Sequence, residues 1–278
     1  DIPIGKYVTL WEHQNKGIHW LFSRLKMGFN PVLADEMGLG KSLQMILTLQ
    51  VLPKTKKQSL VVCPASVAYN WVNEFKKFAP KVTVGIWKSK WPNTQIVICS
   101  YGLCQSRSSE LLKKKLHLLC LDEAQKIKNH RTKTRTSIMK VKAEYKVALT
   151  GTPIENKLHD LWSIFDVLMP GYLGTRSQFT KRFSKTPEML AQAIKPFLLR
   201  RTKNILREKL PEKIINKVEV HLCPEQVALY QNVVQQSLHV IKGKERMTRK
   251  GRILAMITQL KQLCNHPQNY SEKLDKMP

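Results

Sequence analysis

Acidic residues are scarce in this sequence. Its 278 residues include 20 Asp and Glu against 47 Lys and Arg, which gives a formal net charge of +27. The surplus runs through both halves of the chain, so it is not a basic tail. Such a surplus is typical of a protein that binds a polyanion, and nucleic acid is favoured over a membrane because no amphipathic membrane stripe is evident. A lysine-rich proteome would produce the same composition without any binding function.

Long apolar runs and metal-binding cysteine pairs are also missing. No stretch reaches the ~18 uncharged apolar residues that a membrane helix needs. Residues 1–6 do not begin a basic-then-apolar signal peptide, so we expect an intracellular protein. No Cys-x-x-Cys pair is present, and Cys63, Cys99 and Cys120 end apolar runs. They are therefore predicted to be buried thiols, not zinc ligands or a redox pair.

One nine-residue stretch, 34–42, stands between an apolar run at 31–34 and an apolar-periodic segment that begins at Leu43. Strand, glycine loop and helix, in that order, form a phosphate cradle, because glycine lets backbone N–H groups approach an anion at a helix N-terminus. Lys41 could reach the outer phosphates, and Ser42 could bind a bridging Mg²⁺. An ordinary strand-to-helix turn is the alternative. The predicted nucleotide-binding residues here are Asp35, Met37, Gly38, Leu39, Gly40, Lys41 and Ser42.

Strand-like and helical segments alternate along the first 170 residues. Apolar strands are predicted at 59–63, 82–86, 95–100, 116–121 and 145–150, and helices at 10–21, 67–78 and 158–168. This alternation predicts a doubly wound α/β domain with a parallel sheet, in which ligands bind at the carboxyl ends of the strands. The remainder is predicted to be mainly helical, with a brief strand at 218–222.

Two predicted strands end in residues whose side chains could take part in catalysis. Asp122 and Glu123 follow strand 116–121, where Asp122 would hold Mg²⁺ and Glu123 would orient and deprotonate an attacking water. An acid-rich helix start would give the same dipeptide. Strand 145–150 leads into Thr150, Gly151 and Thr152, which could sense the phosphate and relay its presence, or form an ordinary turn.

Two further features are predicted to bind ligands. Gln14, on the helix before the phosphate loop, could read an adenine edge, although a solvated helix residue is the alternative. No acidic residue interrupts 124–143. Lys126, Lys128, Asn129 and Arg131 in this segment are predicted to bind the phosphates of a nucleic-acid backbone, the alternative being a solvated basic helix face.

In this order the motifs resemble the Swi/Snf-related ATPases, the chromatin-remodelling and DNA-translocase branch of the superfamily-two helicases. Gln125 stands where many relatives have His. A glutamine followed by a basic residue and Ile-Lys-Asn looks more like the prokaryotic members. The similar segments are 10–14 (Q motif), 34–42 (motif I, in the shorter form A-x-x-x-G-x-G-K-S), 61–71 (VVCPASVAYNW, motif Ia), 100–101 (motif Ib), 122–129 (DEAQKIKN, motif II), 148–156 (ALTGTPIEN, motif III) and the landmarks FLLRRTK, LPEK and QLKQLCNHP.

The resemblance implies a hydrolase with two RecA-like lobes that uses ATP and Mg²⁺ and acts on double-stranded DNA, with a DNA-bound protein complex as a candidate remodelling substrate. It implies DNA contacts by Asn70, Trp71 and Tyr101. Residues 1–170 would be the first lobe, 171–205 a helical protrusion, and 206–278 a linker with the leading helices of a second lobe.

Motifs IV to VI have no counterpart in these residues, so we expect them to be nearly inactive alone. A prokaryotic member would work in the cytoplasm beside the nucleoid, and the nucleus is the alternative. A nucleotide-regulated nucleic-acid-binding module without hydrolysis is the competing function. A kinase-like phosphotransferase is a remote third, because the chain shows no signature of an acceptor pocket.

Overall fold

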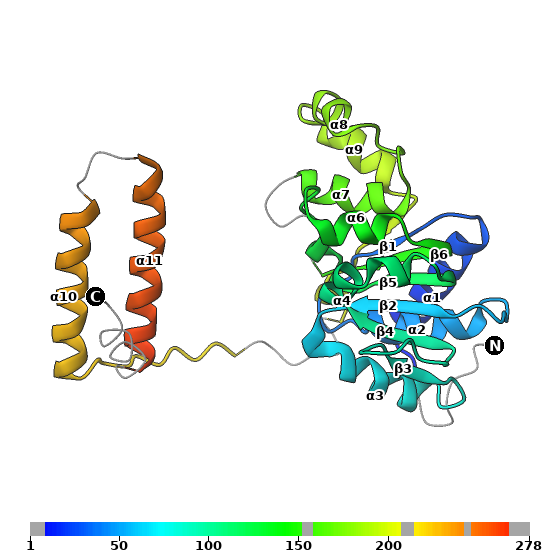
Figure 1. The fold of residues 1–278 in the computed structure, drawn as a ribbon, viewed down its shortest axis with the longest axis horizontal. Helices are drawn as coiled ribbons and strands as arrows, with labels where there is room; N and C mark the ends of the chain where they lie inside the picture. Colours follow the sequence, from blue (N-terminus) through cyan, green and yellow to red (C-terminus); the bar gives the residue numbers. More distant parts are fainter. Residues whose placement is uncertain (1–8, 152–157, 207–213, 242–245, 267–278) are drawn as a thin grey trace. The chain divides into compact units, whose positions relative to one another are not determined.

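The computed structural model describes residues 9–151, 158–206, 214–241 and 246–266 (Figure 1). The chain divides into two compact units, Asp1–Pro211 and Glu212–Pro278. In the second unit, helices α10 (Pro224–Ile241) and α11 (Arg246–Asn265) pack against each other. No helix in the described ranges is both long and apolar enough to cross a membrane.

The strand predicted at 218–222 is wrong. Residues 214–223 form neither helix nor strand, and Val218 and Val220 are 81% and 83% exposed. Alternating apolar residues stabilise a strand only where a neighbouring strand pairs with it and its apolar face is buried, and these valines have neither.

The first unit contains a parallel sheet with the strand order β3-β4-β2-β5-β6-β1-β7 in its described residues. This confirms the predicted RecA-like α/β fold class. The last of these strands, β7, was not predicted, since two residues are too few for a periodic signal. The strands are β1 (Val32–Leu33), β2 (Ser59–Cys63), β3 (Val84–Ile86), β4 (Ile96–Ser100), β5 (Lys115–Leu121), β6 (Lys142–Leu149) and β7 (Leu198–Leu199).

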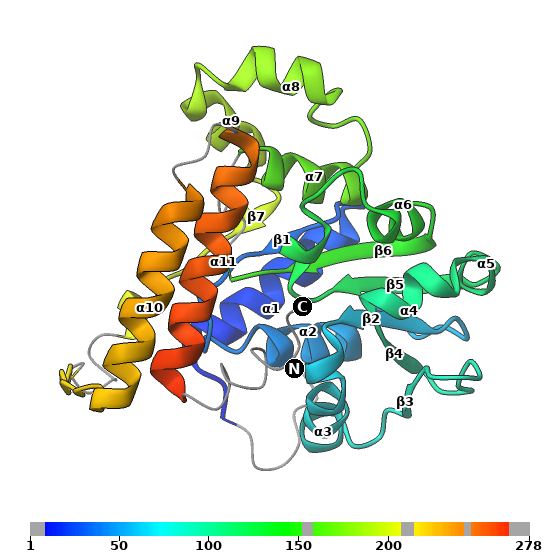
Figure 2. The ribbon, with the colours of Figure 1, turned by 60° about the vertical axis from the view of Figure 1, so that its left-hand side comes forward.

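Helices cover both faces of this sheet, as Figure 2 shows. One face carries α1 to α3, and the other carries α4 to α7. The helices of the first unit are α1 (Glu12–Lys26), α2 (Lys41–Val51), α3 (Ala68–Phe78), α4 (Tyr101–Ser106), α5 (Ser108–Leu111), α6 (Lys133–Met139), α7 (Leu158–Leu168), α8 (Arg176–Phe183) and α9 (Pro187–Ile194), with single 3₁₀ turns η1 (Ala65–Val67), η2 (Ala124–Ile127) and η3 (Lys203–Leu206).

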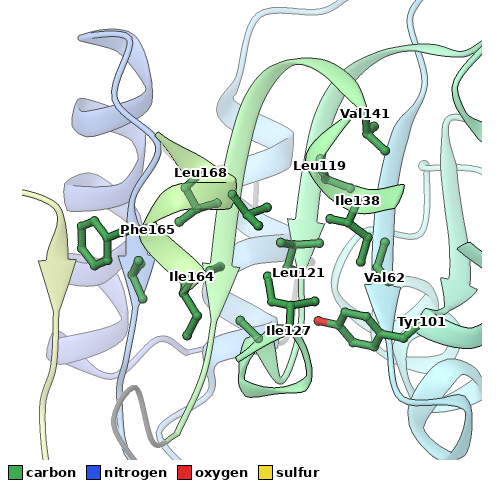
Figure 3. Packing of buried hydrophobic residues seen from close by; sticks show 14 of the residues in the cluster. Val62, Tyr101, Leu119, Leu121, Ile127, Ile138, Val141, Ile164, Phe165 and Leu168 are labelled. Atoms are coloured by element: carbon green, nitrogen blue, oxygen red, sulfur yellow. The ribbon is translucent and has the colours of Figure 1, made fainter. Parts of the chain in front are cut away.

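Alternate residues of the central strands face opposite layers of the core. Val62 and Leu121 pack with Ile138 of α6 and Ile164 of α7 (Figure 3). Their neighbours along the strands, such as Val61 and Cys120, face α1, α2 and α3 instead. Because both faces are covered, the strands are apolar throughout, as parallel strands usually are.

The predicted burial of three cysteines is confirmed. Cys63, Cys99 and Cys120 are all buried free thiols, and burial raises the pKa of Cys63 to about 12. A thiol with a raised pKa is a poor nucleophile and a poor metal ligand, which fits a packing role.

The order of the strands determines where the predicted motifs meet. Strand β6 lies between β1 and β5, and the parallel register sets Leu33 beside Leu149 and Leu121 beside Ala148. The carboxyl ends of these three neighbouring strands therefore carry the phosphate loop, the Thr-Gly turn and the Asp-Glu pair at one edge of the sheet.

Candidate nucleotide site

The phosphate loop has the backbone geometry that its glycines predict. Gly38 and Gly40 have φ of 91° and 78°, in the left-handed region, and α2 begins at Lys41. The first N–H groups of α2 thus point toward the loop, where they can bind an anion. The Lys41 ammonium donates to the Asp35 carbonyl at 2.8 Å. Burial lowers the pKa of Lys41, while nearby carboxylates, Glu123 first among them, oppose that shift.

The structure brings Gln14 to this loop. A Cβ placed on Gly40 would lie 2.7 Å from Gln14 Nε2, so the Gln14 side chain lies against the loop at this glycine. His13, the preceding residue, has Nε2 3.2 Å from the carbonyl oxygen of Leu39. The beginning of α1 is therefore seated directly on the phosphate loop, as a residue that reads the base of a bound nucleotide requires.

Asp122 lies at the end of β5 with both carboxylate oxygens in hydrogen bonds. The Trp71 indole donates to Oδ2 at 2.8 Å, and the Glu123 backbone N–H donates to Oδ1 at 3.0 Å. Burial raises the pKa of Asp122, and the hydrogen bond from Trp71 opposes that rise. The carboxylate is therefore positioned before any ligand arrives.

The side chains around Asp122 fit a magnesium ion that is shared with a nucleotide. Mg²⁺ takes oxygen ligands and is usually held by one or two carboxylates together with substrate phosphates. Burial raises the pKa of Glu74, hydrogen bonds from Asn70 and Ser42 oppose that rise, and the charge of Asp122 adds to it. The side chains of Ser42, Glu74 and Asp122 are therefore neighbours. No group of three His, Cys, Asp or Glu side chains capable of holding a metal occurs in the described ranges. Ser42 and Asp122 would hold the ion only together with a nucleotide.

Glu123 adopts a conformation that its side chain disfavours. With φ of 50° it is the only non-glycine residue with positive φ in the described part of the chain. A non-glycine residue in this region costs roughly 1–3 kcal/mol and is most often found at functional sites. Its carboxylate accepts a hydrogen bond from Gln125 Nε2 at 2.6 Å, and Gln125 Oε1 accepts one from the Thr150 hydroxyl at 2.8 Å. This chain of hydrogen bonds joins the ends of β5 and β6.

The Thr-Gly turn is close to the phosphate loop as well. A Cβ placed on Gly151 would lie 3.8 Å from Lys41 Nζ. Gly151 thus lies beside Lys41, where the predicted coupling role is sterically reasonable. Thr152, the third predicted coupling residue, lies outside the described residues.

Two predicted DNA contacts are corrected by the structure. The side chains of Trp71 and Tyr101 are 1% and 8% exposed, so they are not available to DNA. Both instead hydrogen-bond to Asp122 of motif II: Trp71 donates to its carboxylate, and the Tyr101 hydroxyl donates to its carbonyl oxygen at 2.7 Å. Only Asn70 of this predicted group is exposed, and its amide donates to Glu74 at 3.2 Å.

The basic segment after motif II lies largely at the surface. Lys126, Asn129 and Arg131 are exposed, and Lys128 is half-buried. Arg135, at the end of the same segment, is instead buried in an ion pair with Asp166 of α7. A cavity of about 480 Å³ opens beside the segment, and its lining is polar and basic: Gln105, Ser106, Ser108, Arg131, Lys133, Thr136 and Ser137.

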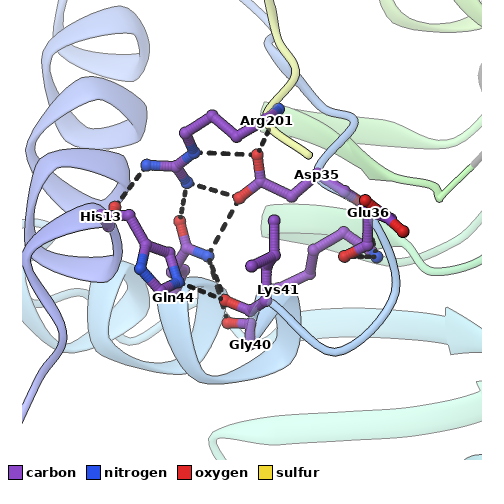
Figure 4. Close-up of polar contacts among 8 residues, drawn as sticks. His13, Asp35, Glu36, Gly40, Lys41, Gln44 and Arg201 are labelled. Carbon is purple, nitrogen blue, oxygen red and sulfur yellow. Dashed lines mark hydrogen bonds and ion pairs between the residues drawn. The ribbon is translucent and has the colours of Figure 1, made fainter. Parts of the chain in front are cut away.

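Sequence reasoning missed the residue that contacts Asp35. The Asp35 side chain is fully buried and forms an ion pair with Arg201 (Figure 4). The two residues are 166 positions apart, and Arg201 follows the unpredicted strand β7, so no local pattern pointed to the contact.

A parallel sheet whose adjacent strand ends carry a phosphate loop, an Asp-Glu pair and a Thr-Gly turn defines the class of the RecA-like, helicase-type ATPases. The comparisons specify the family within this class. The SNF2-related domain matches residues 13–269, and the chain belongs to that family.

Its relatives include bacterial and eukaryotic proteins. It is 39% identical over 287 aligned positions to the putative ATP-dependent helicase/translocase YwqA of Bacillus subtilis, an alignment that covers 94% of this chain and 31% of YwqA. It is 32% identical to the human SWI/SNF-related matrix-associated actin-dependent regulator of chromatin subfamily A member 1, with 93% and 27% covered. The chain thus spans less than a third of the length of these two relatives.

A solved structure shows the same fold. The Sulfolobus solfataricus SWI2/SNF2 ATPase core in complex with dsDNA is 38% identical and superposes with a TM-score of 0.69, covering 94% of this chain and 59% of the core. A second structure, the Sulfolobus solfataricus SWI2/SNF2 ATPase core domain, is also 38% identical and superposes with a TM-score of 0.67.

Proposed function

We propose that this chain is the ATP-binding part of a DNA-dependent ATPase, which couples hydrolysis to movement on double-stranded DNA or to the remodelling of DNA-bound proteins. The observation that carries the proposal is the convergence of Lys41, Asp122 and Glu123 at neighbouring strand ends. Both carboxylates act electrostatically on Lys41, which supports a single site that combines a cation, a candidate metal ligand and a candidate base.

The residues of this site would divide the work between binding and proton transfer. Lys41 would leave the Asp35 carbonyl for the outer phosphates, and Gln14 would bind the base. Ser42 and Asp122 would hold Mg²⁺, which would neutralise charge on the phosphates. Glu123 would accept the proton of the attacking water, with Gln125 orienting its carboxylate through the 2.6 Å hydrogen bond.

DNA would bind at the basic surface after motif II. Lys126, Lys128, Asn129 and Arg131 would contact backbone phosphates, which carry no sequence information. The net charge of +27 and the likeness to an ATPase core in complex with dsDNA support this partner. The relative in Bacillus supports a prokaryotic protein that works in the cytoplasm beside the nucleoid, the nucleus being the alternative.

A nucleotide-regulated nucleic-acid-binding module without hydrolysis is the competing proposal. Glu123 argues against it, because a protein that only binds nucleotide needs no base next to Asp122. The strained backbone at Glu123 points the same way, since it aims the side chain at a cost in stability.

Calorimetric titration of the protein with Mg²⁺-ATP tests the proposal. Lys41→Ala should weaken ATP binding by ~2 kcal/mol or more, because it removes a charge-assisted contact. Glu123→Gln should bind ATP nearly as the wild type does and, in a chain that includes a second lobe, should lose hydrolysis. Equal loss of binding in the two variants would argue against the separate roles assigned to them.

A further inference from the structure

A buried ion pair joins the phosphate loop to a segment far along the chain. Strand β7 pairs with β1 so that Leu199 lies beside Leu33, and the chain then passes the loop. Arg201 donates to Asp35 Oδ1 from its backbone N–H at 3.1 Å and from Nε at 2.9 Å, and its guanidinium also contacts Oδ2. Figure 4 shows the guanidinium laid against the carboxylate.

Gln44 of α2 extends this ion pair into a network. Its Oε1 accepts from Arg201 at 2.7 Å, and its Nε2 lies 3.2 Å from both Asp35 Oδ2 and the Leu39 carbonyl oxygen. The guanidinium also donates to the carbonyl oxygen of His13 on α1. Arg201 therefore links α1, the loop and α2 at a single point.

The network is built into the packing of the helices. A Cβ placed on Gly17 of α1 would lie 1.8 Å from Gln44 Oε1 and 2.7 Å from the Arg201 guanidinium, so glycine at this position lets α1 pass without displacing the network. The Asp35 side chain is fully buried, and a buried carboxylate is tolerated only when it is paired and hydrogen-bonded. Arg201 and Gln44 supply both conditions.

Lys203 brings a second ammonium group to the same loop. Its backbone N–H donates to the Glu36 carboxylate at 2.7 Å, which fixes the segment beside the loop. A Cβ placed on Gly38 would lie 3.4 Å from Lys203 Cε and 3.7 Å from Nζ. This ammonium thus lies against the phosphate loop at Gly38, on the side of the segment that follows β7.

We propose that residues 198–203 form a further wall of the nucleotide site. Arg201 is a positioning residue that fixes the loop through Asp35 and Gln44, and Lys203 contacts the phosphates of a bound nucleoside triphosphate. This inference rests on the proposed function, because it requires that the loop bind a nucleotide.

Lys203→Ala tests the second ammonium, with Arg200→Ala as the matched control. Both residues are exposed and both variants remove one positive charge, but only Lys203 lies over the loop. Calorimetry should show ATP binding weakened about 10-fold by Lys203→Ala, because a charge-assisted phosphate contact is lost. Adenosine binding should be unchanged, and Arg200→Ala should bind ATP as the wild type does. Equal ATP affinities of the two variants would overturn this part.

Arg201→Lys tests the positioning role, since it keeps the charge but cannot bind both oxygens of Asp35 and Gln44 together. Its amides at 36–40 should exchange hydrogen faster than those of the wild type, and its ATP affinity should fall, while the strand amides of β5 stay protected. A folded Arg201→Lys protein with wild-type exchange at 36–40 and wild-type ATP affinity would contradict the role. Arg201→Gln, with Asp35→Asn to avoid an unpaired charge, provides a second variant with the same expected result.

Lys41→Ala separates failure of this inference from failure of the proposed function. If the wild-type protein does not bind ATP, or if Lys41→Ala binds it equally well, both proposals fail. If Lys41→Ala loses ATP binding while Lys203→Ala and Arg201→Lys bind like the wild type, the site is a nucleotide site and only the further wall is refuted.

Discussion

The indole nitrogen of Trp71 lies 2.8 Å from Asp122 Oδ2 and donates a hydrogen bond to it. Trp71 is on α3, within the segment that resembles motif Ia, and Asp122 ends β5. A donor fixed by core packing favours the charged form of a carboxylate that burial otherwise makes more basic. The tryptophan thus favours the charged form of Asp122, which the proposed role of this residue as a metal ligand requires.

Trp71→Phe should weaken divalent metal binding to the ATP complex. A hydrogen bond to a charged group contributes ~1.5–3 kcal/mol, so the affinity for Mn²⁺ used as a probe should fall about 10-fold or more. Electron paramagnetic resonance titration of Mn²⁺ with excess ATP measures the effect without any turnover.

Trp87→Phe is the control for that measurement. Trp87 is equally buried, and within the described residues its indole nitrogen has no hydrogen-bond partner. The control should leave Mn²⁺ affinity unchanged. If both variants reduce the affinity to the same extent, the effect is one of packing and not of the Asp122 hydrogen bond.

Gln125 should be replaceable by histidine but not by alanine. Histidine can donate from one ring nitrogen to Glu123 and accept the Thr150 hydroxyl at the other, as the glutamine amide does. In a chain that includes a second lobe, Gln125→Ala should lower kcat by about 10-fold with little change in KM, because an imperfectly oriented base loses only part of the ~10²–10⁴-fold effect of general-base catalysis. Gln125→His should retain most of kcat. Equal activity of Gln125→Ala and wild type would exclude an orienting role.

Sequence patterns predicted the site where neighbouring elements carry the signal. The loop at 34–42, Asp122 and Thr150 all follow apolar strands, and in a parallel sheet such ends share one edge. The side chain of Trp71 was misplaced because an aromatic residue in a DNA-contacting motif and one in a core look alike in sequence. Its direction is set by the helical face of α3, which packs on the sheet.

Two features could not be read from local sequence at all. Arg201 contacts Asp35 across 166 positions, and that contact exists only because β7 adds to the edge of the sheet beside β1. The positive φ of Glu123 follows from the sharp turn after β5, where no glycine marks it. Both are tertiary effects imposed on residues whose own propensities are ordinary.

DNA binding should be insensitive to sequence and should weaken steeply with salt. Each lost phosphate contact reduces the slope of log K against log salt by about one, so replacing Lys126, Lys128 and Arg131 with alanine should flatten it by up to ~3. Fluorescence anisotropy of a labelled duplex from low to moderate salt measures the slope.

A control triple variant can be made at the amino ends of the strands, opposite the carboxyl ends that carry the site. Lys54 and Lys56 lie in the connection that enters β2, and Lys81 lies in the one that enters β3, all exposed. Their replacement by alanine removes the same charge and should leave the salt slope nearly unchanged. An equal change in both triple variants would mean that total charge, and not the surface after motif II, determines binding.

Residues 1–278 should bind ATP and DNA weakly but show almost no DNA-stimulated hydrolysis. In phosphoryl transfer of this kind, an arginine from outside the nucleotide-binding lobe stabilises the transferring phosphate, an effect of roughly 10³ to 10⁵ in rate. Arg201 is held by Asp35 and is not free to supply that charge, and the chain covers 59% of the Sulfolobus ATPase core. A chain extended through a complete second lobe should recover stimulation, as phosphate release with and without duplex DNA would show. Robust stimulation in residues 1–278 that Glu123→Gln abolishes would show that an arginine within these residues, or from a second copy of the chain, completes the site.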